Sequence, residues 1–191
     1  MSAPPRAIRR ADLSMDEERM HQALRGGYAG RLATVGVDGW PYVVPLLYTV
    51  QAGLIYVHNS SVPGHLRANI ENSDRACFVV DEPGTVYAYG RFECDTALSY
   101  ISVMAFGTIR VVASDVEKAG FCDALMEKYA RGVPDRPKGF YPRLDHITVY
   151  AMQVERLTGK EIQLPAAAAQ WPSLDRTKSP QACPSAAGAQ S

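Results

Sequence analysis

The sequence has no long apolar run. No uninterrupted apolar stretch approaches the roughly 18 residues that a membrane span requires. The segment Met1–Arg10 carries charge and proline but lacks the hydrophobic core of a secretory signal. We therefore expect a cytoplasmic protein that does not enter a membrane.

An excess of charge of either sign is also missing. Lys and Arg together number 20, as do Asp and Glu, so the formal net charge is zero. A neutral chain has no overall attraction to a polyanion, and binding to nucleic acid or to an anionic membrane would need a local basic patch. The sequence shows no such patch, and we expect neither partner.

Cysteine is scarce, and several catalytic and nucleotide-binding motifs are absent. No G-x-S-x-G elbow occurs, which argues against a hydrolase triad. Neither G-x-G-x-x-G nor G-x-x-x-x-G-K-[ST] occurs, which excludes nucleotide binding of the Rossmann or P-loop kind. The cysteines form no C-x-x-C pair and have no histidine at metal-ligand spacing, which predicts reduced thiols and no metal site; they are Cys77, Cys94, Cys122 and Cys183.

The length of 191 residues supports one domain with extensions. We expect this domain to cover residues 14–164, after an N-terminal extension over residues 1–13. Residues 165–191 are rich in Ala, Pro, Ser and Gln and bury too little apolar surface to offset their ordering entropy, which predicts a C-terminal tail. Trp171 in this tail is expected to be solvent-exposed; docking on a partner surface is the alternative.

Residue patterns predict three short helices separated by strands. The first follows a capping box at Ser14–Glu17, the second covers His65–Asn72, and the third follows another capping box at Ser114–Glu117. The dipeptides Asp38-Gly39 and Ala52-Gly53 are typical of tight turns between strands, since they accept positive φ angles.

Segments rich in β-branched and aromatic residues predict the strands. Gly107 lies inside the longest segment and would supply a bend there. About six antiparallel strands with three short helices indicate an α+β fold, a six-stranded split β-barrel with short flanking helices. The predicted strand segments are Gly30–Val37, Tyr42–Val50, Leu54–His58, Arg75–Asp81, Thr85–Arg91, Tyr100–Ala113 and Ile147–Arg156.

The segment His58–Arg67, between the third strand and the second helix, is the best candidate for a site. It gathers imidazole, amide, hydroxyl and guanidinium groups at a helix N-terminus, where free backbone N–H groups and the helix dipole favour an anion. A phosphate group would suit this position. The alternative is that Ser60 and Ser61 cap the helix while the basic side chains are solvated, and spacing alone leaves it open.

A series of short motifs runs along most of the chain. They are Leu32-Ala33-Thr34, Asp38-Gly39-Trp40-Pro41, Val44-Pro45-Leu46, Tyr48, Ile55-Tyr56-Val57-His58-Asn59-Ser60, Gly64-His65, Tyr100-Ile101-Ser102-Val103, Phe106-Gly107 and Leu157-Thr158-Gly159-Lys160. In order and spacing this series resembles the FMN-binding split-barrel superfamily of pyridoxamine 5′-phosphate oxidase. Within it, the series is most similar to the nitroimidazole-resistance reductase branch, and the likeness covers roughly residues 11–160.

The resemblance implies a homodimer that binds two FMN molecules in grooves between its subunits and acts on a small-molecule substrate. Carried over by position, backbone groups of Val44, Pro45 and Leu46 line one edge of the isoalloxazine ring. Ser102 approaches the flavin from the other subunit. The contacts implied near the ribityl chain and the phosphate are His58, Asn59, Ser60, Gly64, His65 and Arg67.

The two histidines of this set, His58 and His65, carry different implications. Members of the superfamily often have a lysine where this chain has His65, and a histidine is only partly protonated at neutral pH. Arg67 would replace the missing charge. A histidine at the position of His58 lies beside the flavin in the nitroimidazole branch and is linked to reactivity there, so His58 is the candidate catalytic residue. In the other interpretation it only hydrogen-bonds the cofactor.

The resemblance therefore predicts an FMN-dependent oxidoreductase for a small molecule, and its sharpest form is a nitroaromatic reductase. Oxidation of pyridoxamine phosphate is a further possibility, although the basic residues for a second phosphate are not evident. Related split barrels use a deazaflavin or bind haem. Two other classes stay open: a flavin or haem carrier or sensor without turnover, and an interaction module without a cofactor.

Overall fold

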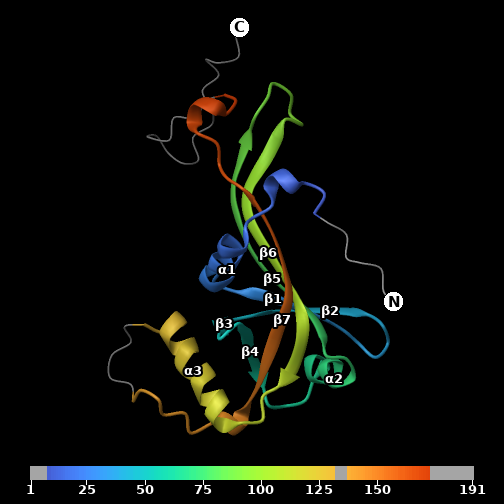
Figure 1. Ribbon diagram of the computed structural model, residues 1–191, viewed down its shortest axis with the longest axis vertical. Coiled ribbons are helices and arrows are strands. Elements are labelled where there is room, and N and C mark those ends of the chain that lie inside the picture. Colours follow the sequence, from blue (N-terminus) through green and yellow to red (C-terminus); the bar gives the residue numbers. More distant parts are fainter. Residues whose placement is uncertain (1–7, 132–136, 173–191) are drawn as a thin grey trace.

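The computed structural model describes residues 8–131 and 137–172. These residues form a seven-stranded sheet with antiparallel neighbours, in the order β2-β1-β5-β6-β7-β4-β3 (Figure 1). Only Leu47 separates β2 from β3, so the two outermost strands are consecutive in the chain, and the sheet curls into a split barrel. The strands are β1 (Gly30–Val35), β2 (Pro41–Leu46), β3 (Tyr48–Gln51), β4 (Leu54–Ser60), β5 (Arg75–Ala88), β6 (Thr96–Val111) and β7 (Ile147–Ile162).

Helices cover different parts of this barrel. Figure 1 shows α2 and α3 on separate sides of it. The second helix is fixed to β1 by a hydrogen bond of 3.1 Å from Asn69 Nδ2 to Thr34 Oγ1, and both residues are buried. The helices are α1 (Glu17–Gly26), α2 (His65–Asn72) and α3 (Asp115–Tyr129), with short 3₁₀ turns at Ala11–Leu13, Leu144–His146 and Ala167–Ala169.

The predicted class is confirmed, although the strand count and the bounds of three predicted segments differ. The described residues form seven strands rather than six. The predicted segment Tyr42–Val50 divides at Leu47 into β2 and β3, while Arg75–Asp81 and Thr85–Arg91 join into the single strand β5. The junction within β5 carries a register shift between Pro83 and Val86, which explains why the apolar pattern breaks there.

Most of the turns and helix ends predicted from local sequence patterns are confirmed. Gly39 has φ of +81°, and Ala52 and Gly53 have φ of +48° and +80°, as the predicted tight turns require. Ser114 caps α3 by accepting a hydrogen bond from the Glu117 amide. The capping box at Ser14 was wrong: Asp16 caps α1 instead, by accepting from the Arg19 amide at 2.7 Å. Ser14 forms a β-bridge with Lys160 of β7, and that pairing holds it in extended backbone.

The predicted bend at Gly107 is a β-bulge. Phe106 pairs with Arg156, whereas Gly107 pairs with Val154, so β7 carries one extra residue, Glu155, at this point. A Cβ atom on Gly107 would lie 1.8 Å from the carbonyl oxygen of Gln153. Glycine is therefore required here by the close approach of two backbones.

The core has two parts, one on each face of the sheet. The barrel interior is filled by Leu32, Tyr48, Phe78 and Tyr150, each no more than 1% exposed. The second part lies between α3 and the outer face of β4 and β7; its buried members are Tyr56, Val112, Phe121, Cys122, Leu125, Val149 and Ala151. The side chains of β4 thus alternate between the barrel interior and the layer under α3.

The C-terminal segment differs from the expected exposed tail as far as Pro172. The Trp171 amide donates a hydrogen bond of 2.9 Å to the carbonyl of Ala88 on β5. The guanidinium of Arg91 lies 5.9 Å from the centre of the Trp171 ring, which is half-buried. Trp171 therefore packs on the hairpin of its own chain that residues 83–100 form, which we call the arm (Figure 1).

Two further sequence expectations concern the whole chain. Cys77, Cys94 and Cys122 are free thiols, while Cys183 lies outside the described residues. Across residues 8–131 and 137–172, none of the helices combines the length and apolar character that would let it cross a membrane.

The ammonium group of Lys128, near the end of α3, packs against a ring of the barrel core. Its Nζ atom lies 3.8 Å from the centre of the buried Tyr48 ring and has no hydrogen-bond partner among the described residues. Burial lowers the pKa of Lys128 to about 8. At pH 7 the lysine is protonated in both the folded and the unfolded chain, and the folded chain bears the cost of desolvating the ammonium group, which the Tyr48 ring only partly offsets.

We expect Lys128→Met to raise the free energy of unfolding at pH 7 by about 1 kcal/mol, after allowance for partial exposure and for the lost ring contact. The folded pKa lies below the unfolded one, so the cost disappears as pH rises from about 8 through the unfolded pKa of about 10.4. The advantage of the variant should shrink over that window. Urea unfolding of both proteins at pH 7 and pH 9.5 measures this; a difference that does not depend on pH would contradict it.

Candidate functional site

The segment between β4 and α2 forms a helix start with no side-chain cap. Gly64 is the N-cap of α2, and it forms no side-chain cap; across residues 8–131 and 137–172 no side chain is seen to accept from the first-turn amides. The Ser60 hydroxyl accepts a hydrogen bond of 3.3 Å from the Val62 amide instead, so this serine does not cap the helix. The first-turn N–H groups of α2 are therefore available to an anion.

Asn59 brings a side-chain amide to the same end of the barrel. Its Oδ1 accepts a hydrogen bond of 3.2 Å from the Tyr150 hydroxyl. Tyr150 has no exposed surface, and burial raises the pKa of its phenol, so the phenol is protonated and can donate. Sequence reasoning missed Tyr150, because its position in an apolar strand predicts only that it points into the core.

Arg67 and His65 project from the first turn of α2. The Nε atom of Arg67 donates to the Glu71 carboxylate at 2.5 Å, one helical turn along, so the two side chains lie along one face of α2. The His65 ring stacks on Tyr42 of β2, with ring centres 5.8 Å apart and planes at 27°. This stack brings β2 beside the helix start.

We call this group the α2 cradle. It is formed by the first turn of α2 with Gly64, His65 and Arg67, and by Asn59 and Ser60 at the end of β4. Among the predicted site residues, these five are brought together by the fold. The combination of amide N–H groups, a carboxamide and a guanidinium suits an anionic group.

The predicted ring-edge residues lie on the neighbouring strand. Val44, Pro45 and Leu46 belong to β2, which is at one end of the strand order and pairs with β1 along only one edge. Its other edge carries backbone groups that no strand of the sheet meets. Pro45 has no N–H, so it can offer only its carbonyl.

His58 is placed apart from the cradle. Its ring lies 5.3 Å from the Phe121 ring of α3, on the opposite face of β4 from Asn59. Its Nδ1 atom is buried without a hydrogen-bond partner among the described residues, and burial lowers the pKa of His58, which keeps the ring neutral. Within one chain, the structure does not bring this predicted catalytic side chain to the cradle.

Ser102 is also far from the cradle of its own chain. It pairs with Asp81 on β5 and with Lys160 on β7, whereas Asn59 pairs with Thr148 on β7. Twelve residues separate Thr148 from Lys160, which corresponds to roughly 40 Å along an extended strand. Ser102 and Asn59 therefore cannot contact one small molecule within a single chain.

The outer face of β1, β2, β5 and β6 carries an apolar row with charged side chains, Arg31, Arg75 and Asp81, in the neighbouring rows. The register places Val43, Ala33, Cys77 and Phe106 in one cross-strand row. Val43 is 57% exposed, and Met104 in the adjacent row is 41% exposed. Exposed apolar side chains in adjacent rows of a sheet favour an interaction surface.

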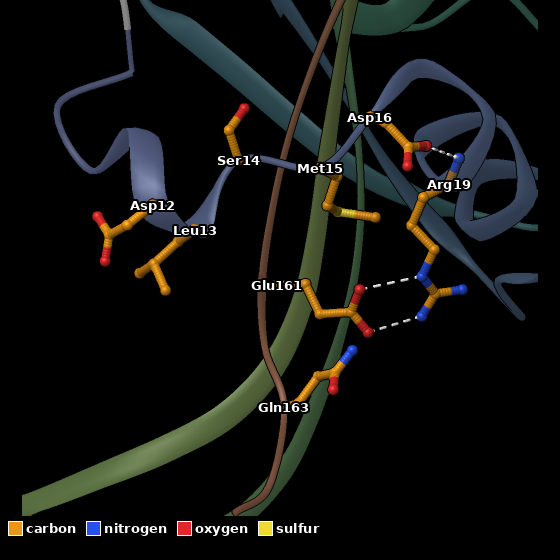
Figure 2. Close-up of a pocket in the computed structure, with 8 residues that line it drawn as sticks. All are labelled: Asp12, Leu13, Ser14, Met15, Asp16, Arg19, Glu161 and Gln163. Carbon is orange, nitrogen blue, oxygen red and sulfur yellow. Dashed lines mark hydrogen bonds and ion pairs between the residues drawn. The ribbon is translucent and has the colours of Figure 1, made fainter.

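A separate cavity of about 480 Å³ lies between α1 and the end of β7 (Figure 2). It is lined by Asp12, Leu13, Ser14, Met15, Asp16, Arg19, Glu161 and Gln163. Figure 2 shows the Arg19 guanidinium bound by both oxygens of Glu161, at 3.0 and 2.7 Å. This ion pair lowers the pKa of the Glu161 carboxyl. Because the charge of Arg19 is already paired with Glu161, the cavity is a weaker candidate for binding an anion than the α2 cradle.

The chain is an α+β split barrel in which the α2 cradle surrounds a helix start without a side-chain cap. The family model described as pyridoxamine 5′-phosphate oxidase matches residues 16–161, and the chain belongs to that family. This match confirms the superfamily resemblance predicted from the sequence motifs. No curated protein matches the chain.

Several solved structures share the fold. A flavocytochrome, Anf3, from Azotobacter vinelandii has a TM-score of 0.70 at 20% identity, over 83% of this chain and 73% of that one. A FAD- and haem-binding protein from Mycobacterium smegmatis has a TM-score of 0.66 at 24% identity, over 78% and 72%. A candidate 5-nitroimidazole antibiotic resistance protein from Bacteroides thetaiotaomicron has a TM-score of 0.65 at 20% identity, over 78% and 86%. At these identities the likeness shows the fold.

Proposed function

We propose that the chain is an FMN-dependent oxidoreductase that acts on a small molecule. The observation that carries this proposal is the α2 cradle, where an uncapped helix start, the Asn59 amide and the Arg67 guanidinium meet. Membership in the pyridoxamine 5′-phosphate oxidase family supports it.

The residues present fit the phosphate end of FMN. First-turn N–H groups of α2 point to where an anion would lie, and no side chain in the described part of the chain caps them. The Glu71 carboxylate accepts from Nε of Arg67, so the two Nη nitrogens of Arg67 can donate to phosphate oxygens. His65 adds an imidazole, and its stack on Tyr42 places it beside β2. The phosphate would thus be held by backbone, amide and cationic donors together.

The open edge of β2 would face the ring of the same cofactor. Backbone groups of Val44, Pro45 and Leu46 would bond the polar edge of the isoalloxazine, as the family resemblance implies. FMN, when bound, supplies the atom that accepts or delivers a hydride, N5. The protein supplies position, donors for the phosphate, and exclusion of water.

We further propose that the active unit is a homodimer. The exposed apolar side chains of Val43 and Met104 on the outer face support this, because pairing of two copies would cover them. The roughly 40 Å along β7 between Ser102 and the cradle of its own chain also supports it. If both touch one flavin, Ser102 comes from the partner copy.

The sharpest form of the proposal is reduction of a nitro group on a small aromatic compound. Its support is the sequence resemblance and the shared fold with the candidate 5-nitroimidazole antibiotic resistance protein. Under this form, a direct role for His58 would require a flavin held outside the cradle of its own chain, since its ring faces away from that cradle.

The test is a visible spectrum of the purified protein, followed by mass spectrometry of the small molecule released on denaturation. We expect a flavin spectrum, a released mass equal to that of FMN, and turnover of a nitroaromatic with a chemical or nicotinamide reductant. A colourless protein that takes up no added FMN would overturn the proposal. A haem or FAD spectrum would replace the cofactor, and bound FMN without turnover would indicate a carrier.

A further inference from the structure

Tyr150 makes an interaction that the packing of the barrel does not require. It is fully buried in the interior cluster, where a phenylalanine would supply the same apolar ring. Its hydroxyl nevertheless reaches the end of the barrel and donates to Asn59 Oδ1 at 3.2 Å. Asn59 belongs to the α2 cradle, so the bond links the core to the proposed phosphate site.

The register explains why these groups meet. Asn59 pairs with Thr148, and Val57 pairs with Tyr150, so all four side chains share the face of β4 and β7 that points into the barrel. Burial dominates and raises the pKa of Tyr150, while the hydrogen bond with Asn59, the nearby charge of Arg67 and the Thr148 hydroxyl act to lower it. The phenol, the carboxamide and the guanidinium therefore occupy one neighbourhood.

The direction of the Tyr150 bond decides which end of the Asn59 amide is exposed. A carboxamide has an oxygen that accepts and a nitrogen that donates twice, and phosphate oxygens need donors. When the phenol holds Oδ1, the Nδ2 group points away from it. Without the phenol, the amide can rotate and present its oxygen to the phosphate, where the two would repel.

We propose that Tyr150 is a positioning residue that fixes the Asn59 amide with Nδ2 toward the phosphate, and so sets the preference of the site for FMN over riboflavin. This inference rests on the proposed function. It assigns phosphate selectivity partly to a buried residue that does not itself touch the cofactor.

The experiment compares the dissociation constants of FMN and riboflavin, measured by flavin fluorescence on flavin-free protein. In Tyr150→Phe we expect the Kd of FMN to rise about three- to tenfold, the size expected for one hydrogen bond. The Kd of riboflavin should change less than twofold, because riboflavin has no phosphate. The matched control is Tyr56→Phe, which removes a phenol bonded to Glu117 beneath α3 and should leave both constants unchanged.

A second set of variants separates positioning from packing. In an Asn59→Ala background, Tyr150→Phe should have no further effect on the ratio of the two constants. Thr148→Val should shift the ratio in the same direction as Tyr150→Phe. It replaces Tyr150→Phe as the test variant if Tyr150→Phe does not fold. An unchanged ratio, or an equal loss for both ligands, would overturn the inference. A wild-type protein that binds FMN no better than riboflavin would overturn the proposed phosphate site itself.

Discussion

Replacing His65 and Arg67 together with alanine is expected to raise the Kd of FMN by about 100-fold or more. Each residue stands at the first turn of α2, where the proposed phosphate lies. Hydrogen bonds to a charged group contribute roughly 1.5–3 kcal/mol each, and 1.4 kcal/mol corresponds to tenfold in affinity. The loss of two such donors therefore corresponds to about 100-fold or more in affinity, and the neutral donors that remain do not replace them.

The measurement is a fluorescence titration with FMN and with riboflavin, and only the FMN constant should move strongly. The matched control is His21→Ala with Arg75→Ala, which also removes one histidine and one arginine. Those residues pair with Glu17 on α1 and with Glu155 on β7, outside the cradle. If the cradle variant retains the affinity of the wild type for FMN, the phosphate has been assigned to the wrong place.

Local signals in the sequence were sufficient for much of the fold. The turn at Asp38-Gly39, the bounds of α2 at His65–Asn72 and the cap of α3 at Ser114 depend on residues close together in the chain, and the structure confirms them. The cap of α1 was misassigned because Ser14 pairs with Lys160, a partner that lies far along the chain. Local pattern cannot reveal such a competitor.

The same distinction between local signals and partners far along the chain applies to the candidate site. The resemblance and the helix pattern found the cradle residues Asn59, Gly64 and Arg67, which are neighbours in sequence. Tyr150 could not be found, because its bond to Asn59 depends on the pairing of β4 with β7. The position of His58 depends on α3 covering the other face of that pair. Alternation predicts that His58 and Asn59 point apart, but the tertiary packing decides which of them faces the barrel interior.

We expect Gly107→Ala to lower the free energy of unfolding by about 3 kcal/mol, a larger change than that of Lys128→Met or Gly120→Ala. The new methyl carbon would lie 1.8 Å from the carbonyl oxygen of Gln153 and 3.2 Å from the amide nitrogen of Glu155. Both atoms belong to the backbone of β7 at the bulge, so neither can rotate away as a side chain could. Strands β6 and β7 must separate locally, and the core contacts next to the bulge weaken.

The same substitution at Gly120 is the control, because it tests the opposite physical situation. Gly120 lies inside α3, and a Cβ there would meet no atom within 4 Å. Alanine should stabilise the helix by roughly 0.5–1 kcal/mol, since glycine is the poorer helix former. Thermal unfolding of both variants should move in opposite directions, with a fall of roughly 6–12 °C for Gly107→Ala. A melting temperature for Gly107→Ala equal to that of the wild type would mean that β6 and β7 do not approach as closely at the bulge as described.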